Sequence, residues 1–454
     1  MNREDGGFTW SLTHNSRFEI SKLAVLHASR RTQPDPTNPK KRIALDRPPL
    51  CLQGKMVKEV DSYKYLEVHV DSQLRWTIQA QKGVANATKW VMQLRRLTRI
   101  STGIGIRLMR RLYITVALLK MTYGLDVWYT PPTKPLGHRR SVGSVGVLRQ
   151  MGKLQRLASL SIVGGMKSTP TDLLDAHAGL LPIELTLLCY CHRATIRLCT
   201  LPPVHPLHPL VRATHQSHNG KHQDPIKAAL RIFELDPHKF ETVTPDITPP
   251  AYFSHIKTTI SKTCEDSILT EANDSPDFKI YTDSSGHNGK VGASAVLFRK
   301  GECQAIKSLT YHLGDLTRHS IIEAKITGVL LAAWLIHTTP GSAHFSFSIY
   351  TDSQTVIRLL TRCFSGSGSI LVNAFHTAAN TPLKVNWISG HSKVRGNVKA
   401  DDLASLAAQG QSSPAADLPP LLRKPLPFSA DAEKQVYNQE IKAMWTEQWR
   451  ISPR

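Results

Sequence analysis

The C-terminal half of the chain contains the residues Tyr-Thr-Asp-Ser twice, at Tyr281–Ser284 and at Tyr350–Ser353. Each copy follows a short apolar run that is typical of a β-strand. Each therefore places an aspartate at the carboxyl end of a strand, which is the edge where open α/β sheets bind their ligands. This repeat constrains the region to a sheet in which two neighbouring strands end in acidic side chains.

The elements around this repeat follow a recognisable order. From Phe278 onwards, the hydrophobic periodicity predicts three strands, a helix, a strand, a helix, a strand and a final helix. The expected strands lie in FKIYTDSS, in the hairpin VGASAVLFRKGECQAIKSLTYHLG, in FSFSIYTDSQ and in LKVNWISGH, and the first two helices lie in SIIEAKITGVLLAAWLIH and TVIRLLTRCF. This order predicts an α/β fold with a mixed sheet flanked by helices.

Four acidic side chains could converge in such a fold. Asp283 and Asp352 end neighbouring strands, Glu323 lies in an otherwise apolar helix, and Asp401 opens the last helix. Because an unneutralised carboxylate cluster repels itself, it must be protonated or hold a cation. Oxygen ligands suit Mg²⁺ or Mn²⁺. Two such ions, ~4 Å apart, can activate water and stabilise the leaving oxygen of a phosphodiester, so the predicted chemistry is phosphodiester hydrolysis.

The adjacent aspartates Asp401 and Asp402 raise a second possibility, the metal-binding pair of a polymerase. That pair needs a strand-turn-strand with apolar strands on both sides, whereas the residues after Asp402 have helical spacing. Successive helical residues are rotated by ~100°, so only one of the two aspartates can face a metal site from the first turn of a helix.

The segments IYTDSS, SIIEAK, IYTDSQ and WISGHSKVRGNVKADDLA, in this order, resemble the four motif blocks of a type 1 ribonuclease H. The resemblance implies a ribonuclease H-like mixed five-stranded sheet over residues 277–410 and endonucleolytic hydrolysis of the RNA strand of RNA–DNA hybrids with two Mg²⁺ or Mn²⁺ ions. It implies that the metal carboxylates are Asp283, Glu323, Asp352 and Asp401. The other residues that it implies are His391, which assists proton transfer or product release, and the substrate-side residues Ser284, Ser285, Ser353 and Asn397.

The charge of the chain points to a polyanionic partner. The formal net charge is +22, from 57 Lys and Arg against 35 Asp and Glu, and nucleic acid is its natural partner, with a membrane surface as the rival. The sequence has no run of about 18 apolar residues and no signal peptide, so we expect an intracellular protein, nuclear or cytoplasmic, without a membrane.

The basic residues gather in one helical stretch. Residues 75–125 contain ten basic and no acidic side chains. We expect Arg95, Arg96, Arg110 and Arg111 to contact nucleic-acid phosphates, although a solvated helix face is the alternative.

The first 200 residues carry a second resemblance. NSRFEISKLAVLHASR, VDSYKYLEVHVDSQLRW, MRRLYITVALLKMTYGLDVWY and STPTDLLDAHAGLLPIEL are similar to the thumb and connection region of non-LTR (LINE-like) retrotransposon reverse transcriptases, with Glu67 in place of the usual glycine. No aromatic-x-Asp-Asp precedes them, so the resemblance does not extend to polymerase activity. It implies the C-terminal part of such a polyprotein, truncated at the N-terminus.

The expected domains are therefore four: a reverse transcriptase thumb/connection-like remnant at 1–200, a Pro/His-rich linker at 201–276, the ribonuclease H type 1 domain at 277–410, and a tail with an amphipathic helix at 411–454. Five histidines leave a metal site in the linker open as an alternative. Two alternatives for the function also remain. The chain could be a catalytically silent nucleic-acid-binding fragment of a decayed retroelement, or its partner could be the rest of a reverse transcriptase on another chain.

Overall fold

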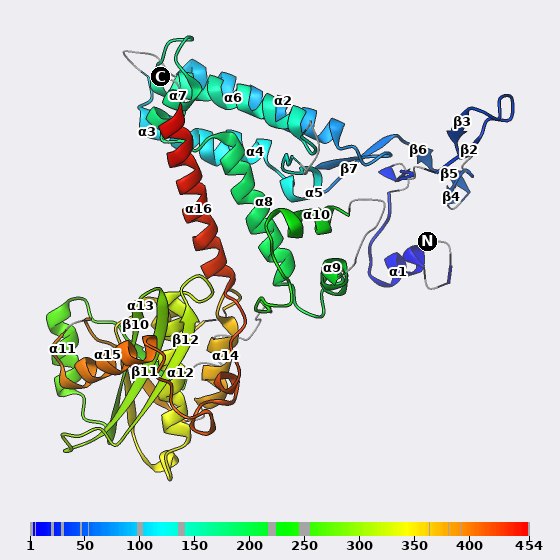
Figure 1. Ribbon diagram of the computed structural model, residues 1–454. Helices are drawn as coiled ribbons and strands as arrows, with labels where there is room; N and C mark the ends of the chain where they lie inside the picture. Colours follow the sequence, from blue (N-terminus) through cyan, green and yellow to red (C-terminus); the bar gives the residue numbers. More distant parts are fainter. Residues whose placement is uncertain are drawn as a thin grey trace. The chain divides into compact units, whose positions relative to one another are not determined.

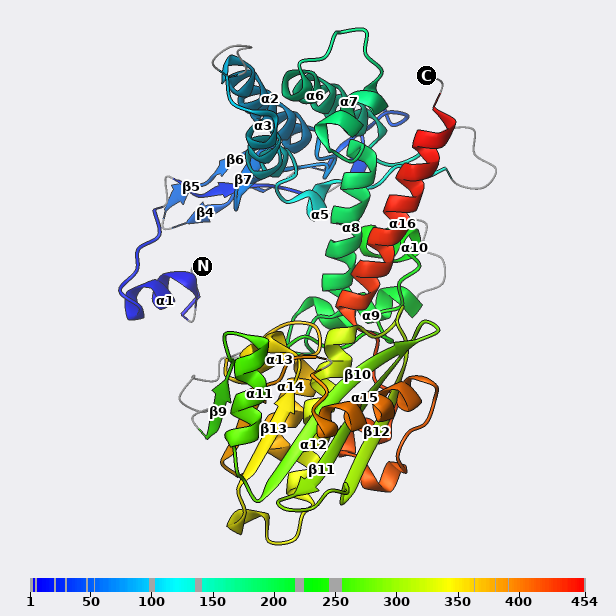
Figure 2. The same cartoon turned by 90° about the vertical axis from the view of Figure 1, so that its left-hand side faces the viewer.

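The computed structural model describes residues 3–4, 6–19, 22–28, 31–45, 48–52, 54–97, 103–134, 141–216, 224–244, 255–362, 364–379, 381–390 and 392–452. The chain forms two compact units (Figures 1 and 2), one made of residues 1–191 and 445–454 and the other of residues 192–444. Two helices, α8 (Ile183–Cys199) and α16 (Ala430–Ile451), contribute residues to both units.

The first unit is mainly helical. Its other helices are α1 (Gly7–Thr13), α2 (Thr77–Leu97), α3 (Ile106–Leu112), α4 (Leu119–Met121), α5 (Leu125–Trp128), α6 (Val145–Val163) and α7 (Thr171–Ala178), with a π-helical stretch at Tyr113–Leu118. Its core contains fully buried side chains such as Tyr113, Met121 and Met151.

No single helix in the described part of the chain is long and apolar enough to cross a membrane. One bent pair of helices, α7 with α8, has the required length and composition when the two are taken together.

The strands of this unit pair locally. They form β1 (Ala24–Val25) with β6 (Lys58–Glu59), β2 (Thr32–Pro34) with β3 (Arg42–Ala44), β4 (Cys51–Leu52) with β5 (Lys55–Met56), and β7 (Ser62–Tyr65) with β8 (Val68–Asp71). The last hairpin turns at Leu66 and Glu67, whose φ angles are 46° and 66°. Two residues in the left-handed region define a turn that favours glycine or asparagine, so Glu67 stands at a strained position.

The second unit contains a six-stranded mixed sheet. The strand order is β12 (Lys307–Asp315), β11 (Lys290–Arg299), β10 (Phe278–His287), β13 (Phe347–Thr351), β14 (Leu383–Trp387) and β9 (Ile256–Thr259). The first three strands are antiparallel, and β13, β14 and β9 run parallel to β10. The prediction of a mixed sheet flanked by helices is confirmed, and the sheet has six strands where five were expected.

Helices cover both faces of this sheet (Figure 2). They are α11 (Cys264–Asn273), α12 (Ile321–His337), α13 (Gln354–Leu360), α14 (Ser369–Ala378) and α15 (Arg395–Ala408). Alternate residues of a strand point to opposite faces. Ile280 belongs to the large core with α12 and α14, whereas Tyr281 belongs to a smaller core with Ala400 of α15.

The region predicted as a linker contains regular structure. It includes α9 (Leu207–Gln216) and α10 (Pro225–Ile232), followed by β9 and α11. Strand β9 pairs with β14 as the edge of the sheet. The sequence does not reveal this strand, because a short edge strand with three exposed residues has no strong alternation of apolar and polar residues.

The segment after α15 also packs on the sheet-containing unit. Ser412 and Ser413 accept hydrogen bonds from the backbone of β12, at 2.8 and 2.9 Å. Leu418, Leu422 and Leu426 are buried in the large core. The part of the tail before α16 is therefore integrated into the fold.

Candidate active site

The two Tyr-Thr-Asp-Ser segments lie on the neighbouring parallel strands β10 and β13. Strand β13 ends at Thr351, as expected, whereas β10 continues to His287 in its pairing with β11, so Asp283 lies within its strand, just past the last residue that pairs with β13. Thr282 of β10 lies opposite Thr351 of β13 in the ladder. The next residue of each strand is an aspartate, so Asp283 and Asp352 lie at adjacent positions of strands that are about 4.8 Å apart. The sheet thus brings these two side chains together at its carboxyl edge, as the sequence predicts.

Helix α15 adds Asp401 to the same edge. Asp283 pairs with Ser294 across the β10–β11 ladder, and the Ser294 hydroxyl donates to the Ala400 carbonyl at 2.6 Å. The approach is close because Gly396 faces the Tyr281 ring, where a Cβ atom would lie 2.2 Å from ring carbons. The sequence predicts Asp401 in the first turn of this helix. The helix begins earlier, at Arg395, so Asp401 lies in its second turn.

The three aspartates form one electrostatic cluster. The pKa of Asp283 is raised to about 6. Burial is the largest cause and the charges of Asp352 and Asp401 act in the same direction, against opposing contributions from the Ser284 amide and from Lys325. A carboxylate that is disfavoured by burial and by like charge is suited to a cation or a proton.

A lysine already provides positive charge at this cluster. Lys325 of α12 donates to both carboxylate oxygens of Asp352, with distances of 2.6 Å to Oδ1 and 2.5 Å to Oδ2. Each side chain of the pair is 19% exposed. Lys325 is not among the site residues predicted from the motifs, although a lysine inside an otherwise apolar helix is a signal of an internal partner.

The structure does not bring Glu323 to this cluster. Glu323 is the third residue of α12, and its Oε2 accepts from the Ser320 amide at 2.7 Å while its own amide donates to the Ser320 hydroxyl. This is a capping box, and the sequence Ser320-x-x-Glu323 carries its signature. Burial raises the pKa of Glu323 to about 7, and the charge of Glu241 contributes in the same direction.

The residues present therefore do not fit two divalent ions. Asp283, Asp352 and Asp401 supply the oxygen donors that Mg²⁺ or Mn²⁺ prefers. The expected fourth carboxylate, however, is engaged at the start of α12, and an ammonium group with no lone pair is bonded to Asp352.

Asp402 faces a different side of α15 from Asp401. It is exposed and lines a hollow together with Lys399 and Phe298. This placement supports the choice of Asp401 over Asp402, and the helical geometry explains it because the two residues are rotated by ~100°.

The predicted substrate-side residues have mixed environments. The Ser353 hydroxyl caps α13 by accepting from the Val356 amide at 3.3 Å. Asn397 is buried within α15 at 2% exposed. Within the described part of the chain, Asn397 Oδ1 and the Ser284 hydroxyl have no hydrogen-bond partner, and Ser285 is half-buried. His391 lies outside the described residues.

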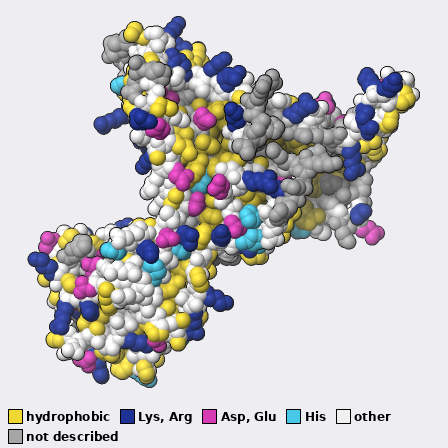
Figure 3. Space-filling view, viewed as in Figure 1, with side chains coloured by type: hydrophobic (Ala, Val, Ile, Leu, Met, Phe, Trp, Pro, Cys, Tyr) yellow, Lys and Arg dark blue, Asp and Glu magenta, His cyan; other side chains and the backbone are white. Residues whose placement is uncertain are grey.

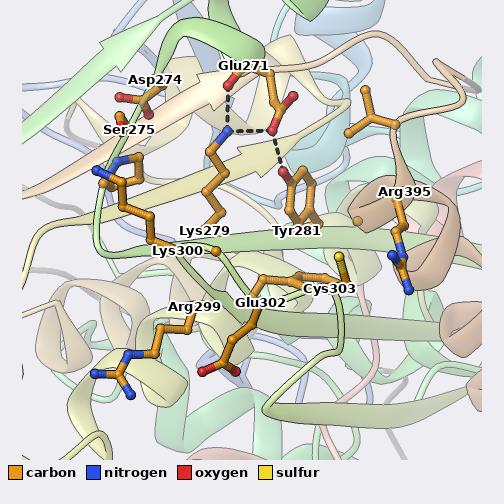
Figure 4. Close-up of a pocket in the computed structure, with 15 residues that line it drawn as sticks. Glu271, Asp274, Ser275, Lys279, Tyr281, Arg299, Lys300, Glu302, Cys303 and Arg395 are labelled. Atoms are coloured by element: carbon orange, nitrogen blue, oxygen red, sulfur yellow. Dashed lines mark hydrogen bonds and ion pairs between the residues drawn. The ribbon is translucent and has the colours of Figure 1, made fainter.

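A pocket lies beside the start of α15, on the face of the sheet that this helix covers (Figure 4). It contains Glu271 of α11, which accepts from the Lys279 ammonium at 2.7 Å and from the Tyr281 hydroxyl at 2.5 Å. Nearby, Asp274 accepts from the Tyr350 hydroxyl at 2.7 Å. These bonds fasten α11 to the sheet, and we assign them a structural role.

The four arginines of the predicted basic surface lie in the first unit. Arg95 and Arg96 are exposed in the last turn of α2, and Arg110 and Arg111 are exposed in the last turn of α3. Arg110 also donates to the Gly179 carbonyl at 2.9 Å. Cations near a helix C-terminus are favoured by the helix dipole, so Arg95 and Arg96 at the end of α2 also have a structural explanation. Figure 3 shows Lys and Arg side chains spread over both units.

A second group of potential ligands lies in the region predicted as a linker. His215, Asp236 and His238 present one ligand atom each within 4.8 Å of one another. His215 and His238 are exposed. They are among several basic side chains there, including Lys239, whose ammonium lies 3.7 Å from Asp236.

Solved structures that match this chain include ribonuclease H domains. The N-terminal RNase H domain of a Mycobacterium tuberculosis protein is 18% identical, with a TM-score of 0.24, and the match covers 29% of this chain and 96% of that one. LC11-RNase H1, isolated from compost, is 16% identical with a TM-score of 0.24 and the same coverage, and one of its crystals contains an RNA/DNA hybrid. RNase H1 from the archaeon Halobacterium salinarum is 15% identical with a TM-score of 0.23, covering 30% of this chain and 98% of that one.

No family model matches the chain, and no curated protein matches it. At these identities and TM-scores, the likeness to the solved structures carries no argument about what this chain binds or does.

Proposed function

We propose that residues 256–426 form a ribonuclease H-like domain that binds RNA–DNA hybrids. The observation that carries this proposal is the convergence of Asp283, Asp352 and Asp401, from β10, β13 and α15, at one edge of a mixed sheet. These aspartates belong to sequence blocks that resemble those of type 1 ribonucleases H, in the same chain order. A hybrid is then recognised by its RNA strand, because the 2′-hydroxyl distinguishes RNA from DNA at a binding site.

The first unit would add affinity that does not depend on sequence. Its exposed arginines can neutralise phosphates and release counterions. The resemblance of this region to the thumb and connection of non-LTR reverse transcriptases supports a retrotransposon origin. In that setting the partner of the chain would be the polymerase part of a reverse transcriptase.

The proposal is tested by equilibrium binding of the full chain to a fluorescent RNA–DNA hybrid and to duplex DNA of the same sequence, both in the presence of EDTA. We expect at least about tenfold tighter binding to the hybrid, or ~1.4 kcal/mol. Equal affinity for the two duplexes would reject hybrid recognition and leave a general nucleic-acid-binding protein.

Cleavage of the RNA strand is the second candidate function. The specific observation in its favour is that three of the four predicted carboxylates do converge. It would need Lys325 to move away from Asp352, because the ammonium lies against both carboxylate oxygens and its positive charge repels a divalent ion there. Incubation of the full chain with a hybrid labelled on the RNA strand, with and without Mg²⁺, distinguishes this function from binding alone.

A further inference from the structure

The geometry points to Lys325 as a built-in counter-ion that occupies the place of a divalent cation at Asp352. We infer that this residue prevents metal binding at the aspartate cluster, and that replacing it with glutamate would create a site for Mg²⁺ or Mn²⁺. The inference concerns the site of the proposed hybrid-binding domain, and its metal test does not depend on hybrid binding.

The first step is the orientation of α12. Glu323 and Lys325 are two residues apart, so they project from the helix about 200° from each other. Glu323 is turned towards Ser320 at the helix start, whereas Lys325 reaches Asp352. Gly328, one turn after Lys325, lies against the backbone of β10, where a Cβ atom would be 3.4 Å from the Asp283 carbonyl oxygen. Residue 325 is therefore on the side of α12 that faces the aspartates.

The second step is that Glu323 cannot take over this position. Its carboxylate satisfies the Ser320 amide, one of the donors that every helix start leaves without an intrahelical partner. Glu323 is 4% exposed, and its Cγ atom lies close to Gly368, where a Cβ atom would be at 3.4 Å. Turning the side chain towards Asp352 would break the capping box and leave a buried amide without a partner.

The third step is the charge of the cluster. Three ionised aspartates and the Lys325 ammonium have a formal charge of about −2. With a glutamate at position 325 the formal charge would be about −4, and the glutamate would add a fourth carboxylate on the helix face that points to the aspartates. The ammonium also repels any approaching divalent ion, and its own bonds to Asp352 are sheltered from solvent screening because both side chains are mostly buried.

The test is a Mn²⁺ titration of the full chain by isothermal calorimetry, with Lys325→Glu, Lys325→Gln and the double variant Lys325→Glu with Asp352→Asn. We expect no saturable Mn²⁺ binding that depends on Asp352 in the wild type at millimolar concentration, and a gain of at least tenfold in affinity in Lys325→Glu that the double variant loses. Lys325→Gln removes the charge without adding a ligand, so it should gain less than Lys325→Glu.

A matched control is Lys307→Glu, which makes the same charge change at an exposed position of the edge strand β12. It should leave Mn²⁺ binding unchanged. Wild-type binding as tight as that of Lys325→Glu, or equal gains in Lys325→Glu and Lys307→Glu, would overturn the inference. Absence of a Mn²⁺ site in folded Lys325→Glu, with folding checked by thermal unfolding, would overturn it as well.

Hybrid binding in EDTA is measured for the same variants. If neither the wild type nor any variant binds the hybrid more tightly than duplex DNA, the proposed function is wrong. The result of the metal titration would still stand. The two failures are therefore distinguishable.

Discussion

Strands β10 and β13 lead into the same four residues, Tyr-Thr-Asp-Ser, but the two aspartates have different surroundings. At β10, the Asp283 carboxylate accepts the amide of the following Ser284 at 2.7 Å, and burial with neighbouring negative charge raises its pKa to about 6. At β13, Asp352 is paired through both oxygens with the Lys325 ammonium, and Ser353 caps the start of α13. Identical local sequences therefore give one aspartate whose surroundings disfavour its charge and one whose charge is balanced by an ion pair with Lys325.

This difference shows that the local motif places the carboxylates but does not determine their chemistry. The residue that decides it, Lys325, comes from a helix in which the motif resemblance points only to Glu323. A ribonuclease H-like arrangement of aspartates is thus compatible with a site that does not take up metal.

The largest effect is expected in cleavage assays in the Lys325→Glu background. There, Asp401→Asn should lower the cleavage rate of a hybrid more than a hundredfold, because it removes a ligand from the cluster, whereas Asp402→Asn should change it less than about tenfold, or ~1.4 kcal/mol of barrier. Single-turnover rates at saturating Mg²⁺ measure both. If Asp402→Asn is the more damaging variant, the helix register is wrong by one residue.

The next largest effect distinguishes Asp283 from Asp352 by the change in the free energy of unfolding when each is replaced. Asp352→Asn leaves the Lys325 ammonium without its carboxylate partner and should lower the free energy of unfolding by about 2 kcal/mol. Asp283→Asn relieves the repulsion within the cluster and should raise it by up to about 2 kcal/mol at pH 7. Urea denaturation at pH 7 measures both, and changes of the same sign would contradict the assigned difference between the aspartates.

The pH dependence of stability gives a sharper comparison. The pKa of Asp283 is raised to about 6 and that of Glu323 to about 7 in the folded protein. Each group therefore contributes stability that is fully present below its unfolded pKa, near 4, and is lost as the pH rises through its folded pKa. Asp283→Asn should flatten the stability profile up to about pH 6, and Glu323→Gln should flatten it up to about pH 7. Thermal unfolding from pH 4 to pH 8 tests this, with Asp402→Asn as a control at an exposed position.

The smallest effect concerns the arginines of the first unit. Replacing Arg95, Arg96 and Arg111 with alanine should reduce the slope of log affinity against log salt by about 0.7 to 0.9 for each phosphate that the protein no longer neutralises. Arg110→Ala should also lower stability, because Arg110 bonds to the Gly179 carbonyl. A slope that stays constant in the triple variant would identify these arginines as a solvated helix face.

Much of the sheet-containing unit is predictable from sequence, because its central strands are short apolar runs bounded by polar turn residues. The strands at Phe278–His287 and Phe347–Thr351 and the adjacency of their aspartates follow from these patterns. Strand β9 is not predictable in this way because an exposed four-residue edge strand has no hydrophobic pattern. The predicted start of α15 was too late, since Val394–Lys399 carries few of the usual start signals and its N-cap is a valine.

The orientation of α12 could not be predicted from periodicity. This helix is buried on almost every side from Ala324 to Ile336. Its apolar residues therefore do not mark one face, and the sequence does not show which side faces the aspartates. The informative signals were the capping box at Ser320, which assigns Glu323 to the helix start, and the single lysine inside the apolar helix. The role of Lys325 itself required the tertiary position of Asp352.

The central claim is tested most directly by a crystal structure of the full chain bound to an RNA–DNA hybrid, grown in Mn²⁺ and analysed by anomalous scattering. The account predicts that the hybrid lies over the edge formed by Asp283, Asp352 and Asp401, that Lys325 remains bonded to Asp352, and that no anomalous peak lies within coordinating distance of that carboxylate. A Mn²⁺ ion bound between Asp283 and Asp352, with Lys325 turned away, would contradict it.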